Sequence, residues 1–161
     1  MKKAFTLLFF VVSISIFSQE NNFWNNVRFG GGLGLGFGNN STTVAVSPAA
    51  VYDFKGGFSL GAGLNYTYFD RNNNTANIYG GSILSMYNIP VVNLQLSGEY
   101  EHSFVNQTVN NVDFSRDVPA LYLGLAYRTG FASFGLRYDV LHDKNKSIYS
   151  SAISPIVRIF F

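Results

Sequence analysis

The sequence predicts an all-β protein, a closed antiparallel up-and-down transmembrane β-barrel of about eight strands. The first observation is that apolar residues recur at every second position after residue 19, which is the period of a β-strand. The second is composition, because charged residues make up only 12% of the 161 residues and aromatic residues 17%, against about 25% charged residues in a soluble domain. The third is that no long apolar run follows the N-terminal one, so any membrane crossing would use strands.

The N-terminus has the order of a secretory signal peptide. Lys2 and Lys3 precede an apolar run from Ala4 to Phe17, and small and polar residues follow. The run is short for a membrane-spanning helix, so we predict a cleaved signal over residues 1–19 and a barrel domain over residues 20–161. The alternative is an N-terminal anchor helix. The chain has no cysteine, which excludes a lipoprotein anchor and disulfide bonds.

Eight alternating segments follow the predicted signal. They cover roughly residues 27–37, 43–54, 58–69, 77–87, 92–104, 121–128, 133–140 and 153–161. In the fourth segment either face could be the apolar one. Asn-rich links, of which the longest covers residues 103–117, alternate with the short turns KGG, NIPV and RTG. Outer-membrane barrels alternate long external loops with short periplasmic turns in the same way, so both termini should lie at the periplasmic end.

The last segment, SPIVRIFF, puts an apolar strand at the very end of the chain. Pairing of this strand with the first one would close the sheet and remove its exposed edges. Val157, Ile159 and Phe161 would then face lipid, and Phe161 would belong to an aromatic girdle. A final Phe after alternating apolar residues also resembles the C-terminal signal that outer-membrane insertion machinery reads. We therefore expect the protein in the outer membrane of a Gram-negative bacterium.

Charged residues fall on the minority face of several strands, which would be the interior of the barrel. An eight-stranded barrel is just wide enough for side chains to fill it, and charges there must pair. The prediction is a neutral, polar plug without a channel; the alternative is a narrow ion or proton path. The eight residues of this predicted interior charge network are Arg28, Asp53, Glu99, Glu101, Arg128, Arg137, Asp139 and Arg158.

Two features that suggest ligand binding have simpler explanations. The glycine-rich run after residue 29 does not fit the dinucleotide pattern, because Gly32 and Gly34 would require a glycine where Phe37 stands. An inward face of glycines instead leaves room for long side chains from opposite strands. Without residues 1–19 the chain has nine basic and nine acidic side chains, so its charge gives no reason to expect nucleic acid.

The histidines are the only groups suggestive of catalysis. His102 stands beside Ser103, and His142 lies near Asp139 and Asp143. All fall near the predicted outer rim, where small-barrel lipid enzymes keep their sites. However, His102 falls on the lipid-facing side of its strand, and nothing fixes a base beside a nucleophile. Two separated histidines are also too few ligands for a metal. We predict no catalysis, no cofactor and no metal, with a lipid-modifying enzyme as the alternative.

A soluble lipocalin-like lipid carrier would show the same alternation with the two faces reversed. The low total charge and the balanced arginine and carboxylate set favour the membrane form. The predicted role is structural or interactive, through envelope integrity or display of the Asn-rich loops, especially residues 105–117. We expect a monomer in outer-membrane lipid, delivered by the insertion machinery.

Three stretches carry a family resemblance: FWNNVRFGGGLGLGFGN, YRTGFASFGLRYDVLHDKNKSIY and SPIVRIFF. Together they resemble a family of small exported outer-membrane barrels from flavobacteria, over nearly all of the mature chain. Some of its members are labelled alpha-ketoglutarate decarboxylase, an activity that requires a thiamine-diphosphate site and several hundred residues. In layout the chain is more distantly similar to the eight-stranded outer-membrane proteins A and X.

Overall fold

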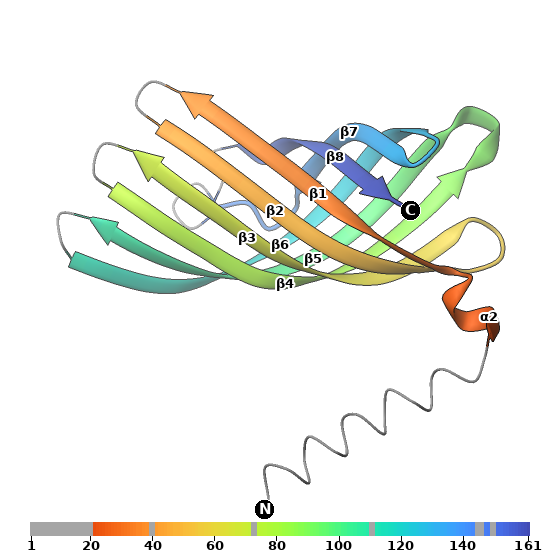
Figure 1. Cartoon of the computed structure of the whole chain (residues 1–161). Helices are drawn as coiled ribbons and strands as arrows, with labels where there is room; N and C mark the ends of the chain where they lie inside the picture. Colours follow the sequence, from red (N-terminus) through yellow and green to blue (C-terminus); the bar gives the residue numbers. More distant parts are fainter. Residues whose placement is uncertain (1–20, 39–40, 72–73, 110–111, 144–146, 149–150) are drawn as a thin grey trace, which may run out of the picture.

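The computed structural model describes residues 21–38, 41–71, 74–109, 112–143, 147–148 and 151–161. Eight antiparallel strands close into a barrel in the order of the chain (Figure 1), which confirms the predicted fold class. A short helix, α2 (Asn21–Trp24), precedes the barrel, and a 3-10 turn, η2 (Pro90–Val92), joins β4 to β5. The strands are β1 (Val27–Gly38), β2 (Ser41–Asp53), β3 (Phe58–Arg71), β4 (Asn74–Ile89), β5 (Leu94–Val109), β6 (Val112–Thr129), β7 (Ala132–Asp139) and β8 (Ile153–Phe160).

The described helices are short, and none is long and apolar enough to cross a membrane. Every strand pairs with its neighbours in sequence, so the barrel is a meander of hairpins. We call the end with both barrel termini and the β2–β3, β4–β5 and β6–β7 connections the turn end. The opposite end, with the β1–β2, β3–β4 and β5–β6 connections, is the hairpin end.

The barrel closes where the first and last strands meet, as the sequence predicts. Gly30, Gly31 and Gly32 pair with residues 160, 159 and 158 of β8. Next to these pairs, on the side of the turn end, Phe29 and Phe161 form two backbone hydrogen bonds of 3.0 Å, one in each direction. Gly30 is required for this approach, because a Cβ atom there would overlap the backbone carbonyl of β8.

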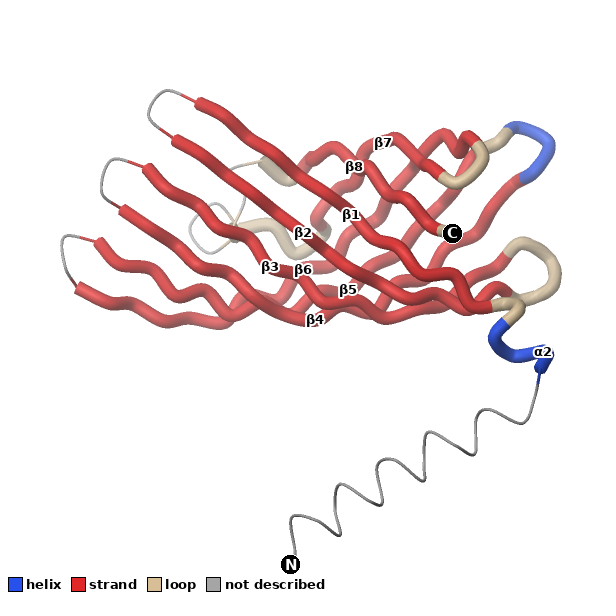
Figure 2. Tube along the Cα trace, in the orientation of Figure 1, coloured by secondary structure: helices blue, strands red, loops and turns tan. Residues whose placement is uncertain are grey.

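This closure is short. Among the residues that the structure describes, residues 33–38 of β1 pair with β2 alone and residues 153–157 of β8 with β7 alone. Figure 2 shows β1 and β2 continuing well past the point where β8 begins. We call the unpaired stretch, between residues 33–38 and residues 153–157, the β1–β8 seam.

The predicted long loop over residues 105–117 is wrong. β5 continues to Val109 and β6 begins at Val112, so most of this region is a strand pair. Polar residues support the pairing, since Ser115 Oγ donates to Asn106 Oδ1 across the hairpin at 2.9 Å. The long connection at this end is instead the one between β7 and β8. At the other end Val92 lies in η2 and not in the fifth strand.

The facing of β4, which the sequence leaves open, is defined by burial. Ile78, Leu84 and Met86 are buried inside the barrel, whereas Tyr79 and Ile83 are exposed outside. Two rims of exposed aromatic side chains surround the outer surface. The rim at the turn end comprises Trp24, Phe29, Phe54, Phe58, Tyr87, Tyr127, Phe131, Phe134 and Phe161, and the rim at the hairpin end comprises Tyr66, Tyr79, Phe104, Phe114 and Tyr138.

Candidate functional site: the barrel interior

The barrel interior consists of layers. The sequence predicts a polar interior throughout, but two of the layers are apolar. Towards the turn end lies an apolar cluster of Val51, Leu84, Met86 and Phe160, each at most 5% exposed. Towards the hairpin end lies a second apolar cluster of Ile78, Val105 and Val118, and Ile148 from the β7–β8 connection packs against it. We call these the lower and upper apolar layers. Polar and charged side chains occupy the space between them.

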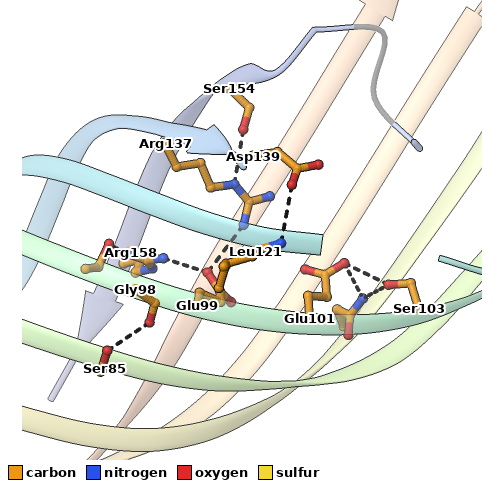
Figure 3. Close-up of polar contacts among 12 residues, drawn as sticks. Ser85, Gly98, Glu99, Glu101, Ser103, Leu121, Arg137, Asp139, Ser154 and Arg158 are labelled. Carbon is orange, nitrogen blue, oxygen red and sulfur yellow. Dashed lines mark hydrogen bonds and ion pairs between the residues drawn. The ribbon is translucent and has the colours of Figure 1, made fainter. Parts of the chain in front are cut away.

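Glu99 is the centre of the buried charges (Figure 3). Its Oε2 accepts a hydrogen bond from Arg158 at 2.7 Å and one from Arg137 at 3.4 Å. The three side chains are only 12%, 8% and 17% exposed, respectively. Arg137 also donates to Ser154 at 3.1 Å, and its guanidinium lies 3.8 Å from the centre of the Tyr122 ring. Two arginines therefore share one carboxylate oxygen, and these charge-assisted hydrogen bonds join β5, β7 and β8.

Glu101 is the next inward-facing residue of β5 after Glu99, and its environment differs from that of Glu99. It is 8% exposed, and its Oε1 accepts hydrogen bonds from Ser103 Oγ at 2.7 Å and Asn65 Nδ2 at 3.0 Å. Asn65 Nδ2 also donates to Ser103 Oγ at 2.8 Å. Within the described residues Glu101 forms no ion pair, and the buried Asn65 Oδ1 atom has no hydrogen-bond partner. Glu101 is therefore satisfied by donors from Ser103 and Asn65 without a direct ion pair, and Asn65 Oδ1 beside it is left without a donor.

The remaining predicted interior charges form separate groups. Arg28 makes a bidentate pair with Asp53 at the turn end, at 2.5 and 2.8 Å, and Ser59 Oγ adds a hydrogen bond to Asp53 at 2.6 Å. Arg128 donates to the backbone oxygen of Gly130 at 3.3 Å.

Asp139 is buried near the hairpin end of β7. Its Oδ1 accepts a backbone N–H bond from Leu121 at 3.3 Å (Figure 3). It accepts a second one from Leu141 at 3.0 Å. The eight residues are thus distributed along the barrel and do not form one network. The alternation of residues along each strand places these side chains on the inward face, but it does not show which carboxylate pairs with which arginine.

A cavity of about 370 Å³ lies in the polar region. Glu99, Glu101 and Asn65 line it from inside. Leu33 of β1 and Val157 of β8, which belong to the barrel wall on the two sides of the seam, also line it. This cavity was not predicted from the sequence. The glycine-rich inward face of β1 is the signal that could have indicated it, because glycines leave space unfilled.

The histidines do not form a catalytic pair with Ser103. His102 is partly exposed on the outer face, with its Nε2 3.7 Å from Asp117 Oδ2, whereas Ser103 is fully buried inside. Consecutive strand residues project to opposite faces, so the barrel wall separates the two side chains. His142 follows the end of β7. In the parts of the chain that the structure describes, no three His, Asp or Glu residues gather as metal ligands.

The predicted insertion-signal residues lie on the outer face of β8. Val157 is 41% and Phe161 77% exposed, and Ile159 is half-buried between them. The backbone of Phe161 takes part in barrel closure through its two bonds with Phe29. No protein-family model matches this chain, and no curated protein matches its sequence, so membership of a flavobacterial barrel family stays a prediction.

Proposed function

We propose that the protein is an integral outer-membrane β-barrel with a structural or surface-interaction role and no catalysis. The observation that carries the proposal is the orientation of its two faces. Aliphatic side chains between the aromatic rims point outward and are 56–68% exposed; they are Leu33, Leu64, Ile83, Leu123 and Leu136. Buried charges are inside. This is the arrangement of a transmembrane barrel and the reverse of a soluble one.

The spacing of the aromatic rims supports the same proposal. Tyr79 and Tyr87 are exposed on the outer face near the two ends of β4. At about 3.4 Å per residue they are roughly 27 Å apart along the strand. A strand tilt of about 40° reduces this to about 20 Å across the membrane, close to the roughly 25 Å apolar band of outer-membrane barrels.

The alternatives receive less support. A lipocalin-like carrier would need a polar outer surface, which the exposed leucines and aromatic rims do not provide. A lipid-modifying enzyme based on His102 and Ser103 would need both side chains on one face of the wall. We expect a signal peptide over residues 1–19 to export the chain, and the insertion machinery to deliver it to the outer membrane of a Gram-negative bacterium as a monomer. The β5–β6 hairpin, with residues 105–117, would then extend outward and provide a surface for contacts.

Cell fractionation combined with heat-modifiable gel mobility tests the proposal. A closed membrane barrel should sediment with the outer membrane and migrate differently before and after boiling. Recovery in the soluble periplasmic fraction would contradict membrane insertion.

A matched pair of substitutions tests the facing directly. Ile83→Arg introduces a charge on the proposed lipid face and should destabilise the barrel in lipid vesicles by about 2–4 kcal/mol. Val91→Arg introduces the same charge in η2, where Val91 is 92% exposed beyond the strands, and should have almost no effect. Equal tolerance of both changes would indicate that water surrounds the barrel wall.

A further inference from the structure

The cavity lies in a polar compartment with an apolar layer on either side along the barrel axis. Leu84 and Phe160 of the lower layer form part of its lining. On the other side, the upper layer begins at Ile78 and Val105, one inward position beyond Gly80 and Ser103 in the β4–β5 register. A polar ligand entering from either end of the barrel would have to pass an apolar layer.

The wall offers a different route. The cavity lining includes Leu33, Pro155 and Val157, whose side chains are exposed on the outer surface. These residues flank the β1–β8 seam, where the two strands are not hydrogen-bonded to each other. Apolar side chains on both sides of an opening suit a hydrocarbon chain better than water. The lining of the cavity therefore reaches the outer wall at the seam, where apolar side chains flank it on both sides.

The chemistry of the compartment specifies which head group would fit. Both arginines that line the cavity already donate to Glu99, with further bonds to Ser97 and Ser154. Glu101 forms no ion pair in the described part of the chain, and Asn65 Oδ1 is a buried acceptor without a donor. Because a buried acceptor without a partner is costly, Asn65 Oδ1 favours a ligand with N–H donors. The Glu101 carboxyl group beside it favours a ligand that also carries positive charge.

We propose that the barrel binds a membrane amphiphile with a primary ammonium head group. The ammonium donates to Glu101 and Asn65, and the hydrocarbon chain leaves through the β1–β8 seam. A cavity of about 370 Å³ is within the size range of small-ligand sites. The entry of the ligand from lipid rests on the proposed membrane location, whereas the chemistry of the head-group site does not.

The binding test uses the mature chain folded in phosphatidylcholine nanodiscs and isothermal titration, with empty nanodiscs as the blank. Dodecylammonium should bind at least about tenfold more tightly than dodecyltrimethylammonium, which has the same charge and chain but no N–H donor. Equal affinity for the two would overturn the proposal. Tighter binding of dodecyl phosphate would also overturn it, since the arginines would then define the site.

Substitutions locate the site. Glu101→Gln keeps the size of the side chain and should weaken dodecylammonium binding about tenfold or more. Asp117→Asn removes a charge from an exposed side chain on the hairpin side and should leave the affinity unchanged. An unchanged affinity in a folded Glu101→Gln barrel would refute the assignment. Competition by dihexanoyl phosphatidylethanolamine would indicate that the ligand is a phospholipid head group. Dodecylammonium binding without this competition would indicate a single-chain amine. Both results support the ammonium site.

A cross-link tests the route. The chain has no native cysteine, so Leu33→Cys with Val157→Cys can be joined specifically by a short bismaleimide across the seam. Cross-linking should abolish dodecylammonium binding, and the same double variant before cross-linking should retain it. Full binding after cross-linking would show that the ligand does not use the seam. A barrel that fractionates with the outer membrane but fails these tests refutes this inference alone, whereas a soluble chain refutes the proposed function whatever it binds.

Discussion

Replacing Glu99 with glutamine should destabilise the barrel more than any other single change in its charged interior. Glu99 accepts hydrogen bonds from Arg158 and Arg137, at 2.7 and 3.4 Å, and all three side chains are at most 17% exposed. Glutamine has nearly the same shape, so packing is preserved while the negative charge is lost. In this variant the guanidinium groups of Arg137 and Arg158 remain in the interior, and the side chain at position 99 no longer carries a negative charge to balance them.

The magnitude follows from the geometry. Removing one partner of a buried ion pair costs about 3–5 kcal/mol, because the remaining charge stays away from water. Arg137→Leu should be milder, at about 1–2 kcal/mol, since Glu99 keeps its shorter bond to Arg158. The order of the two variants is therefore a sharper prediction than either value alone.

Equilibrium unfolding by guanidinium in phospholipid vesicles measures both effects, with Trp24 fluorescence and gel mobility as independent probes. Asp117→Asn is the control, since this side chain is 67% exposed. A Glu99→Gln barrel as stable as the wild type would refute the reasoning, as it would mean that water solvates the arginines. A larger loss for Arg137→Leu than for Glu99→Gln would show that Arg137 stabilises the barrel through contacts other than Glu99.

Further predictions concern closure, insertion, catalysis and conductance. Gly30→Ala should lower the folded fraction on a heat-modifiable gel because its Cβ overlaps the β8 backbone, whereas Gly32→Ala, with 3.3 Å to the nearest atom, should fold; equal yields would contradict this. Deleting Phe161 should reduce outer-membrane levels without blocking export, and unchanged levels would argue against its role in assembly. Replacing His102 and His142 with alanine should leave the acyl-chain pattern of extracted lipids unchanged by mass spectrometry, and an altered pattern would point to an enzyme. The wild type should show no steady current in planar bilayers, since apolar layers flank its polar compartment, and regular single-channel currents would identify a pore.

The period-2 pattern predicts the eight strands well because each strand has one face towards the interior and one towards the surroundings. β7 is an example, with exposed Phe134, Leu136 and Tyr138 alternating with inward Ser133 and Arg137. The same alternation also predicts closure between the first and last strands. The strands depend on local sequence, and closure follows because an apolar last strand needs a partner, so a single chain is enough to infer both.

The hairpin end could not be predicted in this way. Asn106 and Ser115 belong to residue types that favour turns, but here they lie in strands and bond to each other. Val105 and Val118 are buried in the upper apolar layer, within or beside the segment predicted as a loop. Their burial depends on Ile148 from the β7–β8 connection, a contact between segments distant in the sequence.

The candidate site was even less accessible to sequence reasoning. Glu99 meets Arg137 and Arg158 from strands far along the chain, and the stagger of the barrel decides which charges lie at the same height. The unequal lengths of β1 and β8, which create the seam, also come from the three-dimensional pairing. The alternation of residues along each strand identified the inward residues, but the cavity and the unpartnered Asn65 Oδ1 atom depend on this stagger.

The short pairing between β1 and β8 has a consequence for the order of folding. Each of the other seven strand pairs joins neighbours in sequence and can form while later strands are still unfolded. Closure instead brings Phe29 together with Phe161, at opposite ends of the barrel sequence, so it carries the largest loop-closure entropy. An incomplete chain therefore retains two open sheet edges however well its other hairpins have formed. The barrel can therefore be sealed only after β8 is present to pair with β1.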